Sequence, residues 1–302
     1  MTPTVKKKKY TLFRPMILSR HPSHDILRLK HKKIAALPYR SVIRFGSSTE
    51  VEDTVAKGGN RIEINTVNAI KISANKLLMK QKFEEANVKT AEWWHLVNAD
   101  GIVAYSKDTR TNYIELNNLP YPIVAKAHYG SKGKGNTLIK SQEELDTWMQ
   151  GKTLNNYIFE KFMNFGHEFR LHVTEDGCFY TCRKALKQDV PEDQKWRRHD
   201  DICVWFLETN ENFHKPNSWN DIVSDCVKAL KAVGADLLSF DVRVQTPRDK
   251  DGNSRPYQEY ILLECNSASS MDNGTGEVSV CAQKYIDEIP KIIIRKAKQN
   301  GR

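Results

Sequence analysis

Three oxygen-bearing side chains interrupt two otherwise apolar segments in the last quarter of the chain. Asp241 lies within LLSFDVRV, and Glu264 and Asn266 lie two residues apart within EYILLECN. Residues i and i+2 of a strand face the same way, so Glu264 and Asn266 share a face. Hard oxygen ligands suit Mg²⁺, which is commonly held by one or two carboxylates together with substrate phosphates. If the two strands are neighbours, the sequence predicts a magnesium site; otherwise the carboxylates face solvent on edge strands.

A lysine and a glycine-rich loop form the second candidate site. In YPIVAKAHYGSKGKGNTLI, Lys126 ends an apolar strand, and the loop that follows contains Gly130, Ser131, Gly133 and Gly135. Glycine lets backbone N–H groups approach phosphate oxygens closely. The Walker pattern is absent, because no Gly-Lys-Ser or Gly-Lys-Thr sequence opens a helix here. The segment predicts either a simple hairpin or a fixed cation followed by a loop that closes over a phosphate.

The segment IFEKFM, followed shortly by HEFR, offers a third candidate. Backbone groups of Lys161, Phe162 and Met163 could face the edge of a purine. Glu168 could accept hydrogen bonds from ribose hydroxyls, because an ionised carboxylate is an acceptor with two oxygens.

The elements that must position these residues are helices and strands in mixed order. Helices are expected over 24–37, 68–88, 141–150, 218–233 and 277–298, the last interrupted at Pro290. Asn75 is an expected N-cap, and Ser141 with Glu144 forms a capping box. Strands are expected over 41–46, 156–163, 237–244 and 259–266, with a hairpin over 167–186. Because the strands of the second half are mostly antiparallel, we expect an α+β fold.

The net charge of +10 is concentrated at one end of the chain. Residues 1–50 contain twelve Lys and Arg side chains against two acidic ones, and the rest of the chain is balanced. Such a localised field attracts an anionic partner, for example a nucleic acid or an acidic protein. The alternative interpretation is a solvated arm that only aids solubility.

The sequence shows no feature of a membrane or secreted protein. No apolar run approaches the ~20 residues of a membrane span, and the N-terminal segment lacks the apolar core of a secretory signal. We therefore expect a soluble, cytoplasmic protein without a membrane partner. Six cysteines are scattered without the paired spacings of a zinc site, which favours reduced thiols. Cys178 and Cys182 fall on one face of an expected strand, so a zinc or disulfide role remains the alternative.

Taken in order, these segments resemble the ATP-grasp superfamily, and within it the ribosomal-protein glutamate ligases and the D-alanine–D-alanine ligases. The resemblance runs from about Asn75 to Ile289. It implies an ATP-grasp fold in which two α+β lobes hold a nucleotide between them. The domains expected are a basic arm over 1–20, a small N-terminal domain over 21–70, a first lobe with the glycine loop over 71–159, and a second lobe with the metal site over 160–302.

The resemblance also implies roles for individual residues. It implies that ATP is bound by Lys76, Lys126, Gly130, Ser131, Gly133, Gly135, Glu160, Lys161, Phe162, Met163 and Glu168. One or two Mg²⁺ ions, or Mn²⁺, are expected on Asp241, Glu264 and Asn266. Arg170, Arg183 and Arg197 are the expected catalytic cations for the γ-phosphate or an acyl phosphate. The sequence after Asn266, SASSMDNGTGE, departs from the Pro-Gly that is usual in the family.

The reaction implied is the ATP-dependent joining of a carboxylate to an amine through an acyl phosphate, with release of ADP and phosphate. The substrates implied are an amino acid, a peptide or a protein tail, and the basic N-terminal 50 residues could recruit an anionic macromolecule. Two alternatives remain open. One is a kinase of the same fold, and the other is a basic nucleic-acid-binding protein with a vestigial ATP site.

Overall fold

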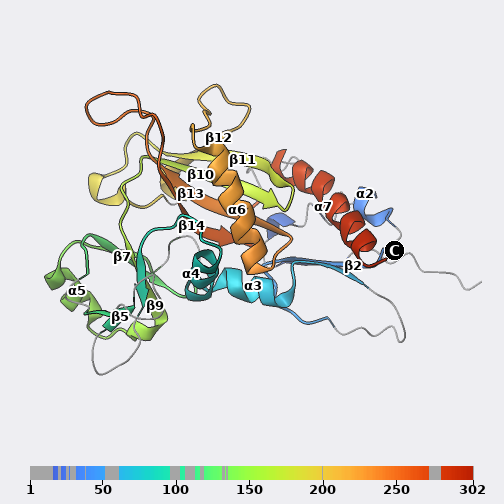
Figure 1. Cartoon of the computed structure of the whole chain (residues 1–302), viewed down its shortest axis with the longest axis horizontal. Helices are drawn as coiled ribbons and strands as arrows, with labels where there is room; N and C mark the ends of the chain where they lie inside the picture. The colour runs from blue at the N-terminus through green and yellow to red at the C-terminus, as the bar shows by residue number, and fades with distance from the viewer. Residues whose placement is uncertain are drawn as a thin grey trace, which may run out of the picture.

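The computed structural model describes residues 16–19, 22–24, 27, 32–37, 39–51, 61–95, 103–105, 113–115, 119–130, 133, 135–198, 200–271 and 280–301. Within them, a five-stranded sheet and a four-stranded sheet form two lobes that meet side by side, and a three-stranded sheet flanks the larger lobe (Figure 1). None of the described helices is long and apolar enough to cross a membrane.

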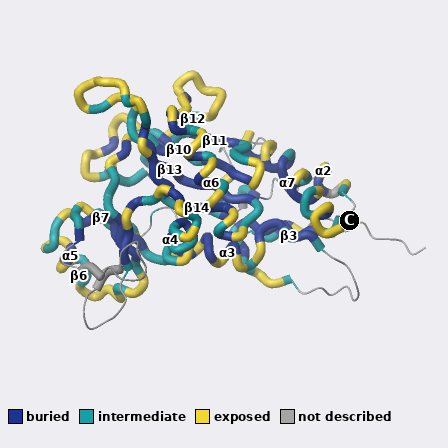
Figure 2. The backbone as a smooth tube through the Cα atoms, viewed as in Figure 1, coloured by how far each residue is buried: buried dark blue, intermediate teal, exposed yellow. Residues whose placement is uncertain are grey.

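The five-stranded sheet is the largest element of the fold. Its strand order is β12-β11-β10-β13-β14, and every neighbouring pair is antiparallel. The strands are β10 (His167–Thr174), β11 (Gly177–Leu186), β12 (Cys203–Leu207), β13 (Leu237–Val244) and β14 (Tyr260–Asn266). Its central strands are buried, whereas the connecting loops at the far end are exposed (Figure 2). The predicted α+β class with antiparallel strands in the second half is confirmed.

Helix α6 (Trp219–Val233) covers one face of this sheet. The apolar side of the helix, including Ile222 and Leu230, joins a core with Phe169 of β10 and Phe240 of β13. Gly234 ends the helix in the left-handed conformation, with φ at 73°, as glycine does after many helices. The predicted helix over 218–233 and its glycine stop are therefore confirmed.

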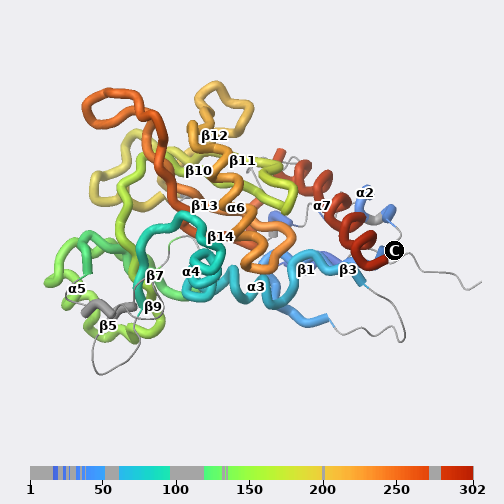
Figure 3. The backbone as a smooth tube through the Cα atoms, in the orientation of Figure 1, coloured from blue at the N-terminus to red at the C-terminus, as the bar shows by residue number. Residues whose placement is uncertain are grey.

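One end of the opposite face is covered by the C-terminal helix and the N-terminal segments. The ring Nδ1 of His172 lies 2.7 Å from the hydroxyl of Tyr285 on α7 (Val280–Gln299). The same helix packs on the parallel strands β1 (Met16–Ser19), β2 (Ser41–Phe45) and β3 (Ile62–Ile64), so the first described strands lie beside the last helix (Figure 3). The other end of this face is left for the cavity described below.

The four-stranded sheet builds the smaller lobe. Its order is β4-β9-β7-β8, from β4 (Trp93–His95), β9 (Tyr157–Lys161), β7 (Ile123–Ala127) and β8 (Thr137–Ile139). Ile123 and Ala125 pack with α5 (Gln142–Met149) on the outer side. Since strand residues alternate, Val124 and Lys126 point to the other side, toward the large sheet. A two-stranded ribbon of β5 (Val103–Tyr105) and β6 (Tyr113–Glu115) completes the described strands.

The predicted helix over 68–88 is two helices, α3 (Val67–Ala74) and α4 (Lys76–Glu85), which meet at Asn75. Asn75 acts as the N-cap of α4, and its side chain accepts a hydrogen bond from the N–H of Leu78 at 3.1 Å. The predicted cap is thus confirmed, but it starts a new helix instead of lying inside one. Ala69, Ile72, Met79 and Phe83 belong to the core of the large sheet, so α3 and α4 pack with the larger lobe.

Two other helix expectations differ from the structure. α7 runs without interruption through Pro290, because proline at this position loses one backbone hydrogen bond that the packed helix can spare. In the part of 24–37 that the structure describes, η1 (Pro22–His24) ends at His24, Leu27 is helical, and α2 (Lys32–Ala35) is a helix of four residues. The remaining short helices are η3 (Leu154–Asn156), η4 (Glu192–Gln194) and η5 (Asp200–Ile202).

A β-bulge in β11 separates the two cysteines that were expected on one face. Cys182 pairs with Arg170, whereas Cys178 pairs with Val173, because the register shifts by one residue between His172 and Val173. The shift turns Cys178 toward the core under α6. All six cysteines are free thiols. The alternative of a disulfide or zinc site at Cys178 and Cys182 is therefore wrong.

We predict that alanine at Gly46 destabilises the fold more than alanine at Gly252. Both glycines have positive φ, at 68° and 86°, but a Cβ at Gly46 would lie 2.6 Å from the Cβ of Ala268, whereas nothing lies within 4 Å at Gly252. Gly252→Ala should cost about 1 to 2 kcal/mol for the left-handed conformation alone. Gly46→Ala should cost about 1 to 3 kcal/mol more, because Ala268 must be displaced. Urea unfolding of the two variants measures the difference, and equal losses would contradict the close contact.

Candidate functional site

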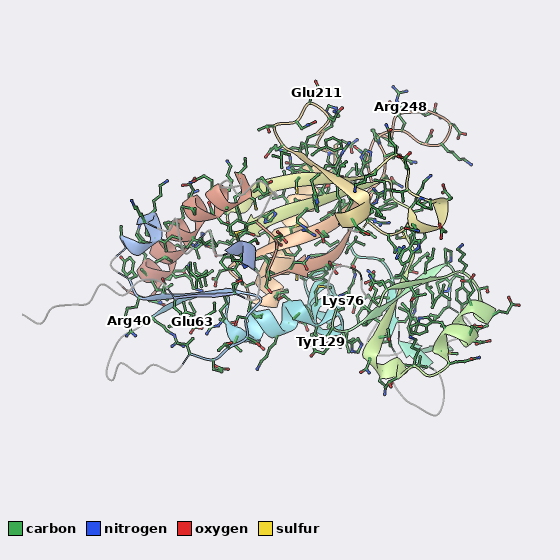
Figure 4. The ribbon with its side chains drawn as sticks, turned by 180° about the vertical axis from the view of Figure 1, so that it is seen from behind. Arg40, Glu63, Lys76, Tyr129, Glu211 and Arg248 are labelled. Carbon is green, nitrogen blue, oxygen red and sulfur yellow. The ribbon has the colours of Figure 1, made fainter. Side chains whose placement is uncertain are left out.

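A cavity of about 520 Å³ lies between the two lobes. The large sheet, the small sheet, the start of α4 and the segment after β14 all contribute to its walls. Lys76 and Tyr129 mark the place where the lobes meet (Figure 4). The predicted residues that line the cavity are Lys76, Lys126, Gly130, Gly133, Glu160, Lys161, Phe162, Met163, Glu168, Arg170, Arg197, Asp241, Glu264 and Asn266.

The strand register explains why distant residues meet on the large sheet. Arg170 of β10 pairs with Asp241 of β13, and Asp241 pairs with Glu264 of β14. Cross-strand partners project from the same face, so these three side chains form a row across the sheet. A second row, two residues nearer the loop that joins the lobes, contains Lys184, Glu168 and Arg243. Both rows of the cavity floor therefore place cations beside carboxylates on neighbouring strands.

Asp241 is the most strongly held carboxylate of the first row. Arg170 donates to it from Nε at 2.7 Å and from Nη2 at 2.9 Å, and Asn266 Nδ2 lies 3.3 Å from the second oxygen. Burial opposes the ionisation of Asp241, but the charge and hydrogen bonds of Arg170, together with the charge of Lys184, outweigh burial and hold the pKa of Asp241 below its ordinary value. Asp241 is therefore ionised in the folded protein at neutral pH.

Lys76 contacts both Glu264, one of the candidate metal ligands, and the glycine loop. Its Nζ lies 3.7 Å from Glu264 Oε2 and donates to the carbonyl of Gly130 at 3.1 Å. The backbone N–H of Lys76 also donates to the carbonyl of His128 at 2.9 Å. The start of α4 is thus joined to the end of β7 and to the edge of the large sheet. A phosphate bound here would meet Lys76 from one side and the glycine loop from another.

Glu160 of the small sheet pairs with two lysines, Lys80 of α4 and Lys126 of β7. Its carboxylate lies 2.6 Å from Lys126 Nζ and 3.1 Å from Lys80 Nζ, and Lys80 also donates to Thr90 Oγ1. Burial opposes the ionisation of Glu160, yet the charges of Lys126 and Lys80 together lower the pKa of Glu160. Burial lowers the pKa of Lys80, and Glu160 counteracts part of that effect. The group fixes Lys126 at the end of β7, as the sequence predicted for a rigid cation.

Glu168 is surrounded by cations. Arg243 Nε donates to Glu168 at 3.1 Å, and Lys184 Nζ and Arg198 Nε each lie 3.9 Å from it. All three cations line the cavity, and none of them was predicted from the sequence. Period-two alternation was the available signal: in FDVRV, Arg243 lies two residues from Asp241 and shares its face.

The structure does not bring every predicted residue to the cavity. Arg183 pairs with Phe169 and Phe206, and its guanidinium lies 5.0 Å from the centre of the Phe206 ring. It therefore faces away from the cavity, and its neighbour Lys184 takes the inward position because successive strand residues alternate. Gly135 is described but does not line the cavity, and Ser131 lies outside the described residues.

In the segment of Lys161 to Met163, between the lobes, two backbone N–H groups are hydrogen-bonded within the protein. The N–H of Lys161 donates to the carbonyl of Glu92, and the N–H of Phe162 donates to the carbonyl of Pro122, both at 2.9 Å. Any contact of these two residues with a ligand therefore comes from their other groups. Val124, Ile261 and Leu263 give this end of the cavity apolar walls, which suits the flat face of a heterocyclic base.

The donor set at Asp241, Glu264 and Asn266 fits Mg²⁺. Every donor in it is a hard oxygen, and Mg²⁺ takes few protein ligands when phosphates complete its coordination. The Nδ2 of Asn266 points to Asp241, so its amide oxygen is the atom left to bind a cation. Among the described residues, no cluster of three or more His, Cys, Asp or Glu side chains is arranged to hold a metal ion. Two carboxylates and one amide are too few ligands to complete the coordination of Mg²⁺. Such a site is therefore suited to Mg²⁺ whose remaining ligands come from a bound phosphate and water.

Comparisons with known proteins give the fold. No family model matches the chain. The formate-dependent phosphoribosylglycinamide formyltransferase of Prochlorococcus marinus is 26% identical over 185 residues, which are 58% of this chain and 42% of that protein. The chain thus spans about two fifths of the length of this curated relative.

Solved structures match over more of the chain. D-alanine–D-alanine ligase from Bacillus anthracis, complexed with ATP, has a TM-score of 0.58 at 14% identity and covers 95% of this chain and 99% of its own. An ATP-grasp RimK domain protein from Sphaerobacter thermophilus has a TM-score of 0.53 at 12% identity and covers 91% and 98%. Carboxyaminoimidazole ribonucleotide synthase from Aspergillus clavatus has a TM-score of 0.51 at 18% identity and covers 81% and 56%. The chain has the ATP-grasp fold, as the sequence predicted.

We predict that Glu160→Gln strongly destabilises the protein. The neutral amide leaves Lys80 and Lys126 without their shared counter-charge in a buried site, which should cost about 3 to 5 kcal/mol. Glu259→Gln is the matched control, because Glu259 pairs with Lys89 on the exposed surface and should cost at most about 1 kcal/mol. Urea unfolding compares the two variants. Similar losses would show that the buried group of Glu160, Lys80 and Lys126 does not stabilise the contact between α4 and the small sheet.

A second prediction concerns pH. Burial, and next to it the charge of Arg170, lowers the pKa of His172 from 6.5 to about 3. Between these values the unfolded chain binds a proton that the folded chain does not, so stability falls as the pH is lowered through this range. His172→Gln should reduce the slope of unfolding free energy against pH by about 1 kcal/mol per pH unit. Urea unfolding at several pH values measures the slope, with His214→Gln, at an exposed histidine, as the control. An unaltered slope in His172→Gln would be the contrary result.

Proposed function

We propose that the protein is an ATP-dependent ligase that joins a carboxylate to an amine and releases ADP and phosphate. The observation that carries the proposal is the meeting of Lys76 and Lys126 with Asp241, Glu264 and Asn266 in one cavity between two lobes. These residues come from distant parts of the sequence and from different sheets. The ATP-grasp fold and the ligases among its structural neighbours support the same reaction class.

In this proposal the nucleotide lies along the cavity. The base lies near the segment of Lys161 to Met163, and the ribose lies near Glu168, which keeps an oxygen for a hydroxyl beside its ion pairs. The phosphates then reach the end where Lys76, Lys126 and the glycine loop converge. Mg²⁺ on Asp241, Glu264 and Asn266 would neutralise charge on the β- and γ-phosphates.

The chemistry proposed needs little covalent work from the protein. A substrate carboxylate attacks the γ-phosphorus, which gives an acyl phosphate and ADP, and an amine then displaces phosphate to form the new C–N bond. Fixed cations and correct positioning lower the barrier in such a transfer. Arg197, with Lys184 and Arg198, is available for the developing anion. Lys184 replaces Arg183 in this set, because Arg183 faces the other side of the sheet.

We predict that Lys76→Met and Glu264→Gln each weaken Mg²⁺-dependent binding of ATP by about 10- to 100-fold, because each removes a charged contact worth about 1.5 to 3 kcal/mol. Isothermal titration calorimetry measures the affinity. Lys228→Met and Glu259→Gln, at ion pairs outside the cavity, are the matched controls and should bind as the parent protein does. Unweakened binding in both cavity variants would refute the assigned nucleotide site.

The reaction itself is tested by trapping. Incubation with ATP, Mg²⁺, a panel of amino acids, peptides and other carboxylates, and hydroxylamine should yield a hydroxamate together with ADP and phosphate in equal amounts. Hydroxylamine takes the place of the amine and displaces phosphate from the acyl phosphate. A kinase would instead give ADP and a phosphorylated alcohol without free phosphate. That result, found by mass spectrometry of the products, would replace the ligase with the kinase.

The recruitment of an anionic macromolecule remains a separate proposal. Most of the basic arm, residues 1–15, lies outside the described residues, and the cavity is formed without it. Deletion of residues 1–15 should raise KM for an anionic acceptor and leave ATP affinity unchanged. An identical KM with and without these residues would remove the recruiting role.

A further inference from the structure

The carboxylate of Asp241 has both oxygens engaged within the protein. The two bonds from Arg170, at 2.7 and 2.9 Å, have the parallel geometry that arginine forms with carboxylates. Only 9% of the Asp241 side chain is exposed, so the pair is shielded from water and correspondingly strong. Asp241 is therefore a neutralised carboxylate, and no longer a bare negative charge on the cavity floor.

Arg170 is itself held on its other side. The guanidinium carbon lies 4.9 Å from the centre of the Trp205 ring, and a cation over an aromatic face is attracted by its quadrupole. Trp205 lies on the outermost strand of the sheet, across from Lys184. Movement of Arg170 would give up two charged hydrogen bonds and the aromatic contact together. The guanidinium is thus a fixed positive charge beside the candidate metal residues.

Glu264 is held much less tightly. Its side chain is 32% exposed, and its contact with Lys76 is a single approach at 3.7 Å. It lies across the strand pair from Asp241 and two residues from Asn266. Of the two carboxylates, Glu264 is therefore the one with an accessible oxygen and an incompletely balanced charge.

We propose that the site binds a single divalent cation with the nucleotide, mainly through Glu264 and Asn266, and that Arg170 takes the electrostatic place of a second one beside Asp241. The proposal rests on the proposed function, because it concerns the same nucleotide site. A second divalent ion would need the charge of Asp241, which Arg170 already balances, and it would lie against the guanidinium. Like charges at such short range repel strongly where water is excluded. The family resemblance allowed one or two ions, and this geometry selects one.

The test counts metal ions in the protein as it exists. With protein in excess over β,γ-imido-ATP, Mn²⁺ is titrated and the free ion is measured by electron paramagnetic resonance. The parent protein should hold one Mn²⁺ per bound nucleotide. Arg170→Met should hold two, because Asp241 then lacks its paired cation and its Oδ1 has lost its hydrogen-bond donor. Arg170→Lys should hold one, because lysine keeps the positive charge.

Two further variants make the count decisive. Arg295→Met is the matched control, since Arg295 pairs with Glu175 and Asp176 outside the cavity, and it should hold one Mn²⁺. Arg170→Gln should hold two, and it serves where the methionine variant does not fold, because glutamine can keep one hydrogen bond to Asp241. Two ions in the parent protein, or one in the folded Arg170→Met or Arg170→Gln variant, would overturn the inference alone. Failure of the parent protein to bind β,γ-imido-ATP would overturn the proposed function with it.

Discussion

The cavity depends on one electrostatic constraint, which is that every carboxylate in its walls is matched by a cation from another segment. Glu160 is matched by Lys126, Glu264 by Lys76, Asp241 by Arg170 and Glu168 by Arg243. Eight lysine and arginine side chains and four carboxylates line the cavity among the described residues, so the walls carry an excess of positive charge. Buried cations in such excess favour an anionic occupant, and a triphosphate meets that requirement better than a neutral metabolite.

The same pairs join the lobes and set the shape of the cavity. Lys76 is the first residue of α4, and the Asn75 cap fixes the start of that helix. The Lys76 side chain contacts both the glycine loop and Glu264. Glu160 draws Lys80 of α4 and Lys126 of β7 to one strand of the small sheet. These ion pairs therefore stabilise the contact between the lobes and also position the side chains of the site. Removal of one pair is expected to alter both the stability and the site geometry.

Much of the site could be predicted from local patterns. Asp241, Glu264 and Asn266 interrupt apolar strands, and period-two alternation placed Glu264 and Asn266 on one face. Arg183 was misplaced because its strand offers two adjacent basic residues, and only the register with Phe169 shows that Lys184 points inward. The alternative of a zinc or disulfide role for Cys178 and Cys182 was wrong for a related reason, since the bulge that turns Cys178 away depends on pairing between strands and leaves no mark in composition.

Other features required the folded chain. Lys80 looks like a solvated helix residue in the sequence, yet it is fully buried, because the fold brings Thr90 and the distant Glu160 to its Nζ. Helix α3 packs on the larger sheet through Ile72, and α4 packs on it through Met79 and Phe83. These positions are set by tertiary contacts and not by helix propensity. Sequence patterns thus indicated the types of residue in the site. Strand pairing determined that Lys184, and not its neighbour Arg183, faces the cavity.

The close contact between Gly46 and Ala268 limits the size of one end of the cavity, whereas the charge of the cavity is set at its other end. The wall beyond Asn266 consists of Gly46, Ala268, Ser269 and Ser270, which are small and uncharged. It is braced by His24, whose Nε2 lies 2.8 Å from the carbonyl of Ser269. The volume available at that end is consequently set by a few atoms contributed by both ends of the chain, whereas the cationic end is built from its middle. Substitutions at these small residues would change the size of the substrate that fits this end of the cavity. The cationic residues at the other end would stay unchanged.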